Sequence, residues 1–236
     1  MENLYIVMPA YNEEENIEAV VSEWHCVVDK IGGGGHIVVI DDGSKDGTYA
    51  KLLQLQATLP RLVAITKPNG GHGAAVLFGY NYALEKNAHF VFQTDSDGQT
   101  LPGEFWEFWE NRNKYDAQIG FRKNREDGKS RVFVTRVLRI VLYLTFRVWI
   151  KDANTPFRLM QSKALRDVIA DIPKEHNLAN VLVTVFFHKK EKKIAYHPIT
   201  FRERQKGTNS INFRKIIRIG INACKDFWRM GKKTRR

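Results

Sequence analysis

The sequence predicts an α/β fold built around a largely parallel sheet, and three observations support this prediction. Short apolar runs of four or five residues recur along the first half of the chain, as in strands that are buried on both faces. Each run ends in a polar or glycine-rich segment, and a stretch with helical character follows. Strand, polar loop and helix thus alternate four times, which is the pattern of a parallel sheet with helices on its faces.

The first predicted strand is stopped by Pro9, and Asn12 or a residue beside it is expected to cap the helix that follows. Glu13, Glu14 and Glu15 would then fall in the first turn of that helix, where the helix dipole favours acidic side chains. The four predicted strands are residues 4–8, 36–40, 62–65 and 89–92.

A polar loop follows each predicted strand. Ligands of open parallel sheets bind beyond the carboxyl ends of the strands, so we expect these four loops to converge on one site. The glycine-rich loop before the third helix could present backbone N–H groups to a phosphate, and a plain left-handed turn is the alternative. The absence of Gly-x-Gly-x-x-Gly after the first strand and of a Walker sequence argues against dinucleotide dehydrogenases and P-loop enzymes. The loops are Pro9–Glu13, Asp41–Thr48, Lys67–Gly73 and Asp95–Gln99.

Asp95 and Asp97 lie one residue apart directly after the fourth apolar run. Carboxylates at alternate positions point to the same side and can share one hard divalent cation, Mg²⁺ or Mn²⁺. Such a cation keeps open coordination positions for substrate phosphates. A solvated turn with an Asp that caps the next helix is the alternative. The three other strand-end loops favour the metal site.

Charge is divided unevenly along the chain. Residues 1–120 contain 8 Lys and Arg against 17 Asp and Glu, whereas residues 121–236 contain 29 against 9, a net charge of +20. The acidic half suits cations and neutral sugar or base groups, and the basic half suits an anionic surface. Cys26 and Cys224 indicate neither a disulfide framework nor a metal cluster. Neither a basic signal-peptide start nor 18 apolar residues without charge occurs, so we expect a cytoplasmic chain without a spanning helix.

Two basic stretches carry bulky apolar residues. Residues 129–151 place four arginines among such residues, which fits an interfacial helix whose cations meet lipid phosphates, with a buried, basic-rimmed helix as the alternative. Residues 211–236 combine apolar spacings of three and four with nine Lys and Arg, which predicts a basic amphipathic helix with a charged tail. We therefore divide the chain into a domain over residues 1–210 and a C-terminal amphipathic segment over 211–236. The four arginines are Arg131, Arg136, Arg139 and Arg147.

Four segments, in this order, resemble glycosyltransferase family 2, and within it the polyprenyl-phosphate sugar transferases. The resemblance covers roughly the first 210 residues. It implies a GT-A type nucleotide-sugar-binding fold with a mixed sheet and a metal-dependent, inverting hexosyltransferase. The implied reaction moves a sugar from a UDP- or GDP-sugar to a polyprenyl (dolichyl or undecaprenyl) phosphate at the cytoplasmic membrane face. The segments are Pro9–Glu13, Val38–Thr48, Lys67–Gly73 and Asp95–Gln99.

The resemblance also implies roles for individual residues. Asp95 and Asp97 would coordinate the cation and the donor diphosphate. Asp97, Asp152 and Arg204 would be the catalytic residues. The implied nucleotide-sugar-binding residues are Pro9, Ala10, Tyr11, Glu13, Asp41, Asp42, Lys67, Gly71, Gly73, Asp95, Ser96, Asp97, Gln99 and Arg204.

The acceptor side is implied by two later segments. Asp152 resembles a family Asp before a small-Gly-Phe turn, although Pro156 replaces the glycine here and changes the backbone locally. Asp152 would be the general base for a hydroxyl acceptor, and no base is required for a phosphate; a helix-terminating Asp is the alternative. Arg204, in a segment like the family's Arg-x-x-Gly-x-Ser loop, would reach phosphate oxygens, with a solvated basic loop as the alternative. The acceptor-binding candidates are Lys129, Ser130, Arg131, Arg136 and Ser210.

Three other functional hypotheses stay open. The enzyme could act on a hydroxyl of a glycan, a lipid-linked oligosaccharide or a protein. The basic half could bind nucleic acid, which the lack of a nucleic-acid motif disfavours. A catalytically dead scaffold is disfavoured by the intact carboxylate pair. The expected partners are therefore a nucleotide sugar, polyprenyl phosphate or another anionic lipid, and the membrane surface, without nucleic acid. For the C-terminal segment, contact with the membrane surface, a membrane-protein partner, a homo-oligomer and truncation of a longer chain are alternatives.

Overall fold

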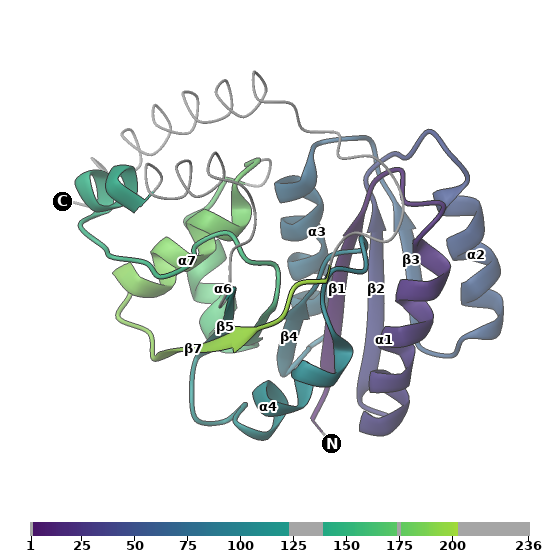
Figure 1. The fold of residues 1–236 in the computed structure, drawn as a ribbon, viewed down its shortest axis with the longest axis horizontal. Helices are drawn as coiled ribbons and strands as arrows, with labels where there is room; N and C mark the ends of the chain where they lie inside the picture. The colour runs from purple at the N-terminus through teal and green to yellow at the C-terminus, as the bar shows by residue number, and fades with distance from the viewer. Residues whose placement is uncertain (1, 123–138, 174–175, 203–236) are drawn as a thin grey trace.

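A computed structural model describes residues 2–122, 139–173 and 176–202. These residues form one seven-stranded sheet in the order β3-β2-β1-β4-β6-β5-β7, with helices on both faces (Figure 1). The four predicted strands are all present. The strands are β1 (Leu4–Ala10), β2 (Gly35–Asp41), β3 (Leu62–Thr66), β4 (Phe90–Gln93), β5 (Ala117–Arg122), β6 (Arg158–Gln161) and β7 (Ile194–Ile199).

The sheet divides the core into two apolar layers. Along β1 the side chains alternate, so that Ile6 and Met8 pack in one layer and Tyr5 and Val7 in the other. The first layer contains α1, α2 and α4, and the second contains α3, α6 and α7. The helices are α1 (Ile17–Ile31), α2 (Thr48–Thr58), α3 (His72–Glu85), the 3₁₀ helix η1 (Pro102–Glu104), α4 (Phe105–Glu110), α6 (Ser162–Ile169) and α7 (Ala179–Lys189).

The sheet is mostly parallel but mixed, as predicted. β1 is parallel to both β2 and β4, whereas β6 runs antiparallel to β4 and to β5. The chain order reverses between β1 and β4, because β2 and β3 extend the sheet on the other side of β1. Crevices at such reversals, beyond the carboxyl ends of the strands, are where α/β sheets bind ligands.

The chain after β1 differs from the prediction, because α1 begins at Ile17 rather than beside Asn12. Asn12 has a φ of 55°, which a helical residue does not adopt. The Glu13 N–H donates to Thr48 Oγ1 at 2.9 Å and the Glu14 N–H donates to Asp46 Oδ2 at 3.2 Å. Side chains of the second loop thus take the backbone donors of the first, and the three glutamates precede the helix.

Aromatic packing fixes β4, the strand that leads to the Asp pair. The Phe92 ring is fully buried, and its centroid lies 5.3 Å from Trp24, 5.0 Å from Phe105 and 4.8 Å from Phe157. Offset and edge-to-face contacts of this kind add to the stabilisation from apolar burial. The end of β4 is therefore held from α1, from α4 and from the segment before β6.

Residues 139–146 are helical and have apolar side chains on two sides. Leu142 and Phe146 are buried in the core, whereas Ile140 and Leu144 are more than half exposed. Residues 139–146 thus combine features of an interfacial helix and of a buried helix, the two alternatives predicted for residues 129–151. Within the described ranges, no helix is both long enough and apolar enough to span a membrane. Residues 123–138 and 203–236 lie outside the described residues, so the division at residue 210 stays a prediction.

Gly79 of α3 is required by the close approach of this helix to the sheet. A Cβ at this position would lie 2.3 Å from Val7 Cγ1 and 3.2 Å from Ile40 Cγ1. We therefore expect Gly79→Ala to destabilise the chain by about 1–3 kcal/mol in urea unfolding, despite the better helix propensity of alanine. Gly103→Ala is the control, because a Cβ there meets no atom within 4 Å. A Gly79→Ala variant as stable as this control would contradict the packing.

Candidate active site

The turn that carries Asp95 and Asp97 directly follows β4 and is held at three points. Thr94 Oγ1 and Thr100 Oγ1 lie 2.7 Å apart and close its base. Ser96 Oγ donates to the carbonyl oxygen of Pro9 at 2.8 Å, which ties the turn to the end of β1. The Gln99 N–H donates to Asp97 Oδ1 at 3.0 Å. The two aspartates are thus presented on a preorganised turn at the point where the strand order reverses.

The surroundings of Asp95 disfavour a negative charge on its carboxylate. Its side chain is 28 % exposed, and its buried Oδ1 accepts no hydrogen bond from the described residues. The pKa of Asp95 is raised to about 6, mainly by burial; His72 opposes this shift and the charge of Asp97 adds to it. The Nε2 atom of His72 is 3.8 Å from Asp95 Oδ1. A buried oxygen without a donor beside a second carboxylate is the environment that a divalent cation would stabilise, so the two aspartates fit a cation site.

Asp42 organises the glycine-rich loop. Its Oδ1 accepts hydrogen bonds from Lys67 Nζ and from the Gly70 N–H, and its Oδ2 accepts one from the Gly71 N–H at 2.8 Å. The neighbouring Asp41 is 1 % exposed and accepts hydrogen bonds from Thr66 Oγ1 and the Ser44 N–H. Asp41, Asp42 and Lys67 were predicted to contact the donor; in this structure their charged groups bond to the chain itself and fix the loops.

Gly71 and Gly73, also predicted to lie along the donor, are sites of close backbone approach. Gly71 has a φ of 88°, and a Cβ there would lie 2.5 Å from Asn177 Oδ1. A Cβ on Gly73 would lie 2.1 Å from the carbonyl oxygen of His176. Segment 176–178, which precedes α7, therefore packs on the glycine loop. The sequence analysis missed this contact, because nothing local links residues a hundred positions apart.

The predicted β1-loop residues have different surroundings. The Ala10 carbonyl oxygen accepts the Asp42 N–H at 2.8 Å, so the first two loops are joined directly. Glu13 is 8 % exposed, and its Oε2 accepts a hydrogen bond from Asn16 Nδ2. Tyr11 is 39 % exposed and presents an aromatic ring at the surface of this loop. The loops from β1, β2, β3 and β4 thus converge, as predicted.

Asp152 is 7 % exposed and accepts the Asn154 N–H at 3.3 Å in the segment before β6. Arg158, which the sequence analysis did not select, is fully buried behind this segment. Its guanidinium donates to carbonyl oxygens of Thr155, Ala153 and Asn180 and to Thr184 Oγ1. Burial lowers the pKa of Arg158, and the charges of Asp152 and Asp95 oppose this shift. The sequence signal that could have identified Arg158 was an arginine placed among apolar residues of a strand.

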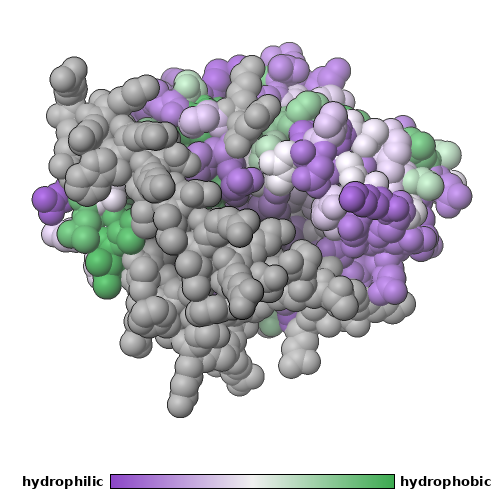
Figure 2. All heavy atoms as spheres, turned by 90° about the horizontal axis from the view of Figure 1, so that it is seen from above, coloured by the Kyte–Doolittle hydropathy of each residue, from purple (hydrophilic) through white to green (hydrophobic). Residues whose placement is uncertain are grey.

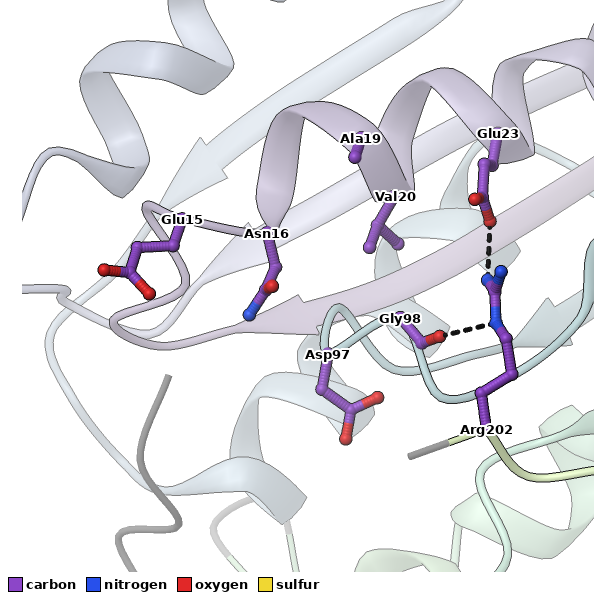
Figure 3. Close-up of a pocket in the computed structure, with 8 residues that line it drawn as sticks. All are labelled: Glu15, Asn16, Ala19, Val20, Glu23, Asp97, Gly98 and Arg202. Carbon is purple, nitrogen blue, oxygen red and sulfur yellow. Dashed lines mark hydrogen bonds and ion pairs between the residues drawn. The ribbon is translucent and has the colours of Figure 1, made fainter. Parts of the chain in front are cut away.

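A small cavity of about 100 Å³ borders the turn on the α1 side (Figure 3). Arg202, from the segment after β7, lines one end of it beside Asp97 and Gly98. The predicted catalytic Arg204 follows two residues later, outside the described residues. The acceptor candidates Lys129, Ser130, Arg131, Arg136 and Ser210 also lie outside them. The cavity is lined by Glu15, Asn16, Ala19, Val20, Glu23, Asp97, Gly98 and Arg202.

The fold and the site together define a class. A mixed sheet whose order reverses between β1 and β4, with an Asp-x-Asp turn at the reversal, is a GT-A type nucleotide-sugar-binding architecture. Among the residues that the structure describes, no three His, Cys, Asp or Glu side chains form a metal-binding group. A cation at Asp95 and Asp97 would keep open positions for substrate phosphates.

The chain belongs to glycosyl transferase family 2, whose model matches residues 5–171. The undecaprenyl-phosphate 4-deoxy-4-formamido-L-arabinose transferase of Pectobacterium atrosepticum is 24% identical over 223 residues, which cover 93% of this chain. The polyprenol monophosphomannose synthase of Mycolicibacterium smegmatis is 34% identical over 101 residues, or 42% of this chain. The matched regions span 65% and 37% of these two relatives, so the chain covers less than two thirds of their lengths.

Solved structures show the same fold. Glucosyl-3-phosphoglycerate synthase from Mycobacterium tuberculosis, crystallised with Mn²⁺, uridine diphosphate and phosphoglyceric acid, aligns with a TM-score of 0.65 at 16% identity. The alignment covers 94% of this chain and 78% of that one. The predicted family and the predicted fold are therefore both confirmed.

Asp95→Asn is expected to stabilise the chain at neutral pH. The folded pKa is about 6 against an ordinary value of 3.8. Between these values the native state binds more protons than the unfolded state, so the free energy of unfolding falls as pH rises through this window. The amide of asparagine is neutral and avoids the cost of burying a negative charge. We therefore expect the free energy of unfolding to rise by about 1–2 kcal/mol at pH 7.5 but to change little at about pH 4. Urea unfolding with chelator at both pH values measures this, and an equal gain at both would contradict it.

Proposed function

We propose that this chain is an inverting glycosyltransferase that moves a sugar from a UDP- or GDP-sugar to a polyprenyl phosphate at the cytoplasmic membrane face. The observation that carries the proposal is the Asp95–Asp97 turn, preorganised beside the glycine-rich loop at the reversal of strand order. Family membership supports sugar transfer. The proposed acceptor is supported by the names of the two relatives, which are an undecaprenyl-phosphate and a polyprenol transferase.

Asp95 and Asp97 would hold Mg²⁺ or Mn²⁺ through carboxylate oxygens. When bound, the cation stabilises negative charge on the departing nucleoside diphosphate. Groups of the chain itself would also stabilise this negative charge. The N-terminus of α3, at His72, carries the positive end of a 14-residue helix dipole next to Asp95. The exposed ring of Tyr11 offers a stacking surface for the nucleotide base.

The reaction would be a single in-line displacement. An acceptor phosphate oxygen forms the new bond to the anomeric carbon while the bond from that carbon to the donor diphosphate breaks, so the configuration inverts. The nucleophile is already anionic and needs no proton acceptor. A phosphate acceptor would therefore leave the buried Asp152, whose Oδ1 accepts the Asn154 N–H, without a role as general base, whereas a hydroxyl acceptor would require one.

An exposed apolar patch supports work at a membrane surface. Ile140, Tyr143, Leu144 and Trp149 are between 45% and 65% exposed, and Figure 2 shows apolar side chains gathered where this segment lies at one edge of the molecule. Arg147 lies over the Tyr143 ring at 5.9 Å. Arg139 and Lys151 belong to the same stretch of chain. Aromatic and aliphatic side chains beside cations match the interface of an anionic bilayer, which is the occupant we propose.

Asp97→Ala should abolish sugar transfer without unfolding the chain, because a partly exposed carboxylate at a strand end contributes little to the core. The assay is a radiolabelled sugar, supplied as UDP- and GDP-donors, that partitions into organic solvent only when polyprenyl phosphate is present. Circular dichroism and thermal unfolding provide the control for folding. Transfer by Asp97→Ala at the wild-type rate would refute the site. Labelling of a hydroxyl acceptor without the lipid would refute the phosphate acceptor.

The membrane patch predicts a loss of vesicle binding in the Leu144→Ala/Trp149→Ala double variant. Each buried apolar side chain is worth about 1.5–3 kcal/mol when fully withdrawn from water, so we expect at least about tenfold weaker binding to vesicles with anionic lipid. Leu53→Ala/Phe78→Ala is the matched control, since these side chains are 45% and 40% exposed elsewhere on the molecule. Equal loss in both double variants, or stronger binding to nucleic acid of equal charge, would contradict the patch.

A further inference from the structure

The segment after β7 is bonded to the turn that carries Asp97. The Arg202 N–H donates to the carbonyl oxygen of Gln99 at 2.8 Å, and Gln99 Nε2 donates back to the carbonyl oxygen of Arg202 at 3.1 Å. Phe201 pairs with Thr100 as an isolated antiparallel bridge. Residues that are a hundred positions apart are thereby joined at Gln99 and Thr100, two of the three positions that follow Asp97.

The Arg202 side chain extends this connection to α1 (Figure 3). Its Nε donates to the carbonyl oxygen of Gly98 at 3.1 Å, and its Nη2 donates to Glu23 Oε2 at 2.7 Å. The same Nη2 lies 3.3 Å from the carbonyl oxygen of Thr100. The planar guanidinium thus bonds to the turn and to the helix at once, which a lysine could not reproduce.

We propose that Arg202 and Glu23 form a clamp that positions the Asp97 carboxylate for the cation. The clamp acts through the backbone, because Gly98 and Gln99 directly follow Asp97 and the Gln99 N–H orients Asp97 Oδ1. Gly98 has a φ of 72°, and a Cβ there would lie 3.3 Å from Val20 Cγ2, so the turn already rests against α1. Arg202 is therefore a positioning residue and need not touch the substrate.

The energetics separate this role from a structural one. The side chains of Arg202 and Glu23 are 29% and 42% exposed, and partly exposed ion pairs contribute little to folding stability. Groups that orient metal ligands, in contrast, change metal affinity by about 10–100-fold when removed. Loss of the clamp should therefore weaken cation binding strongly but change the melting temperature little.

The chain contains a matched control pair at the opposite end of β1. Arg112 Nε donates to Glu2 Oε2 at 2.7 Å, with side chains 26% and 40% exposed. Arg112 also donates to a backbone carbonyl, that of Trp109, at 2.9 Å. The N···O distance, the side-chain exposure and the Arg–Glu chemistry are thus nearly equal in the two pairs. Of the two, only the Arg202 pair adjoins the turn that carries Asp95 and Asp97.

The test is Mn²⁺ binding to the whole chain by electron paramagnetic resonance, with UDP or GDP present and without any acceptor. We expect Glu23→Gln and Arg202→Ala to weaken Mn²⁺ binding about tenfold and to change the Mn²⁺ line shape. Glu2→Gln and Arg112→Ala should stay within about twofold of the wild type. Because the two clamp residues act as a unit, the Glu23→Gln/Arg202→Ala double variant should bind no more weakly than Arg202→Ala.

The inference rests on the proposed function, since it assumes that Asp97 binds a cation, and the outcomes separate the two. Wild-type Mn²⁺ binding that Glu23→Gln leaves unchanged would overturn the clamp alone. No Mn²⁺ binding by the folded wild type would overturn both proposals. If Arg202→Ala failed to fold, Glu23→Gln would decide by itself, because it keeps the arginine and changes only its partner on α1.

Discussion

Two carboxylates placed together at the end of a buried strand are the constraint around which this structure is arranged. Phe92 and its aromatic neighbours hold β4 in the apolar core, so the chain emerges at Asp95 in surroundings that penalise a negative charge. Such a penalty persists in a native chain when the surrounding structure holds the groups in place and a ligand relieves it. The Asp pair thereby links the packing of the core to the chemistry of the site.

The loops around the pair are rigid because they bond to one another. Asp42 accepts three hydrogen bonds from the glycine-rich loop, Ser96 ties the Asp95–Asp97 turn to β1, and Thr48 accepts one from a backbone N–H of the first loop. Charged side chains in such internal contacts fix the conformation of the loops whether or not they contact a substrate. They preorganise the backbone around the Asp pair, and preorganised groups are what a site needs to stabilise developing charge.

The N-terminal half shows how far local patterns reach. The apolar runs located all four of the first strands, because a strand buried on both faces has to be apolar throughout. The same patterns placed the start of α1 too early, because Asn12 and the glutamates have capping chemistry but their N–H groups are taken by Thr48 and Asp46. The insertion of β6 between β4 and β5 was likewise not derivable from strand patterns, which carry no information about neighbours.

By itself, the sequence determined the fold class, the family and the carboxylate pair, because periodicity and short motifs are local properties of the chain. Only the tertiary structure decided what each motif residue touches: that Asp42 and Lys67 bond to each other, that Asn177 rests on Gly71, and that Arg202 reaches Glu23. These contacts join residues between 25 and 179 positions apart. Side chains that distant meet only after the sheet has set the order of its strands.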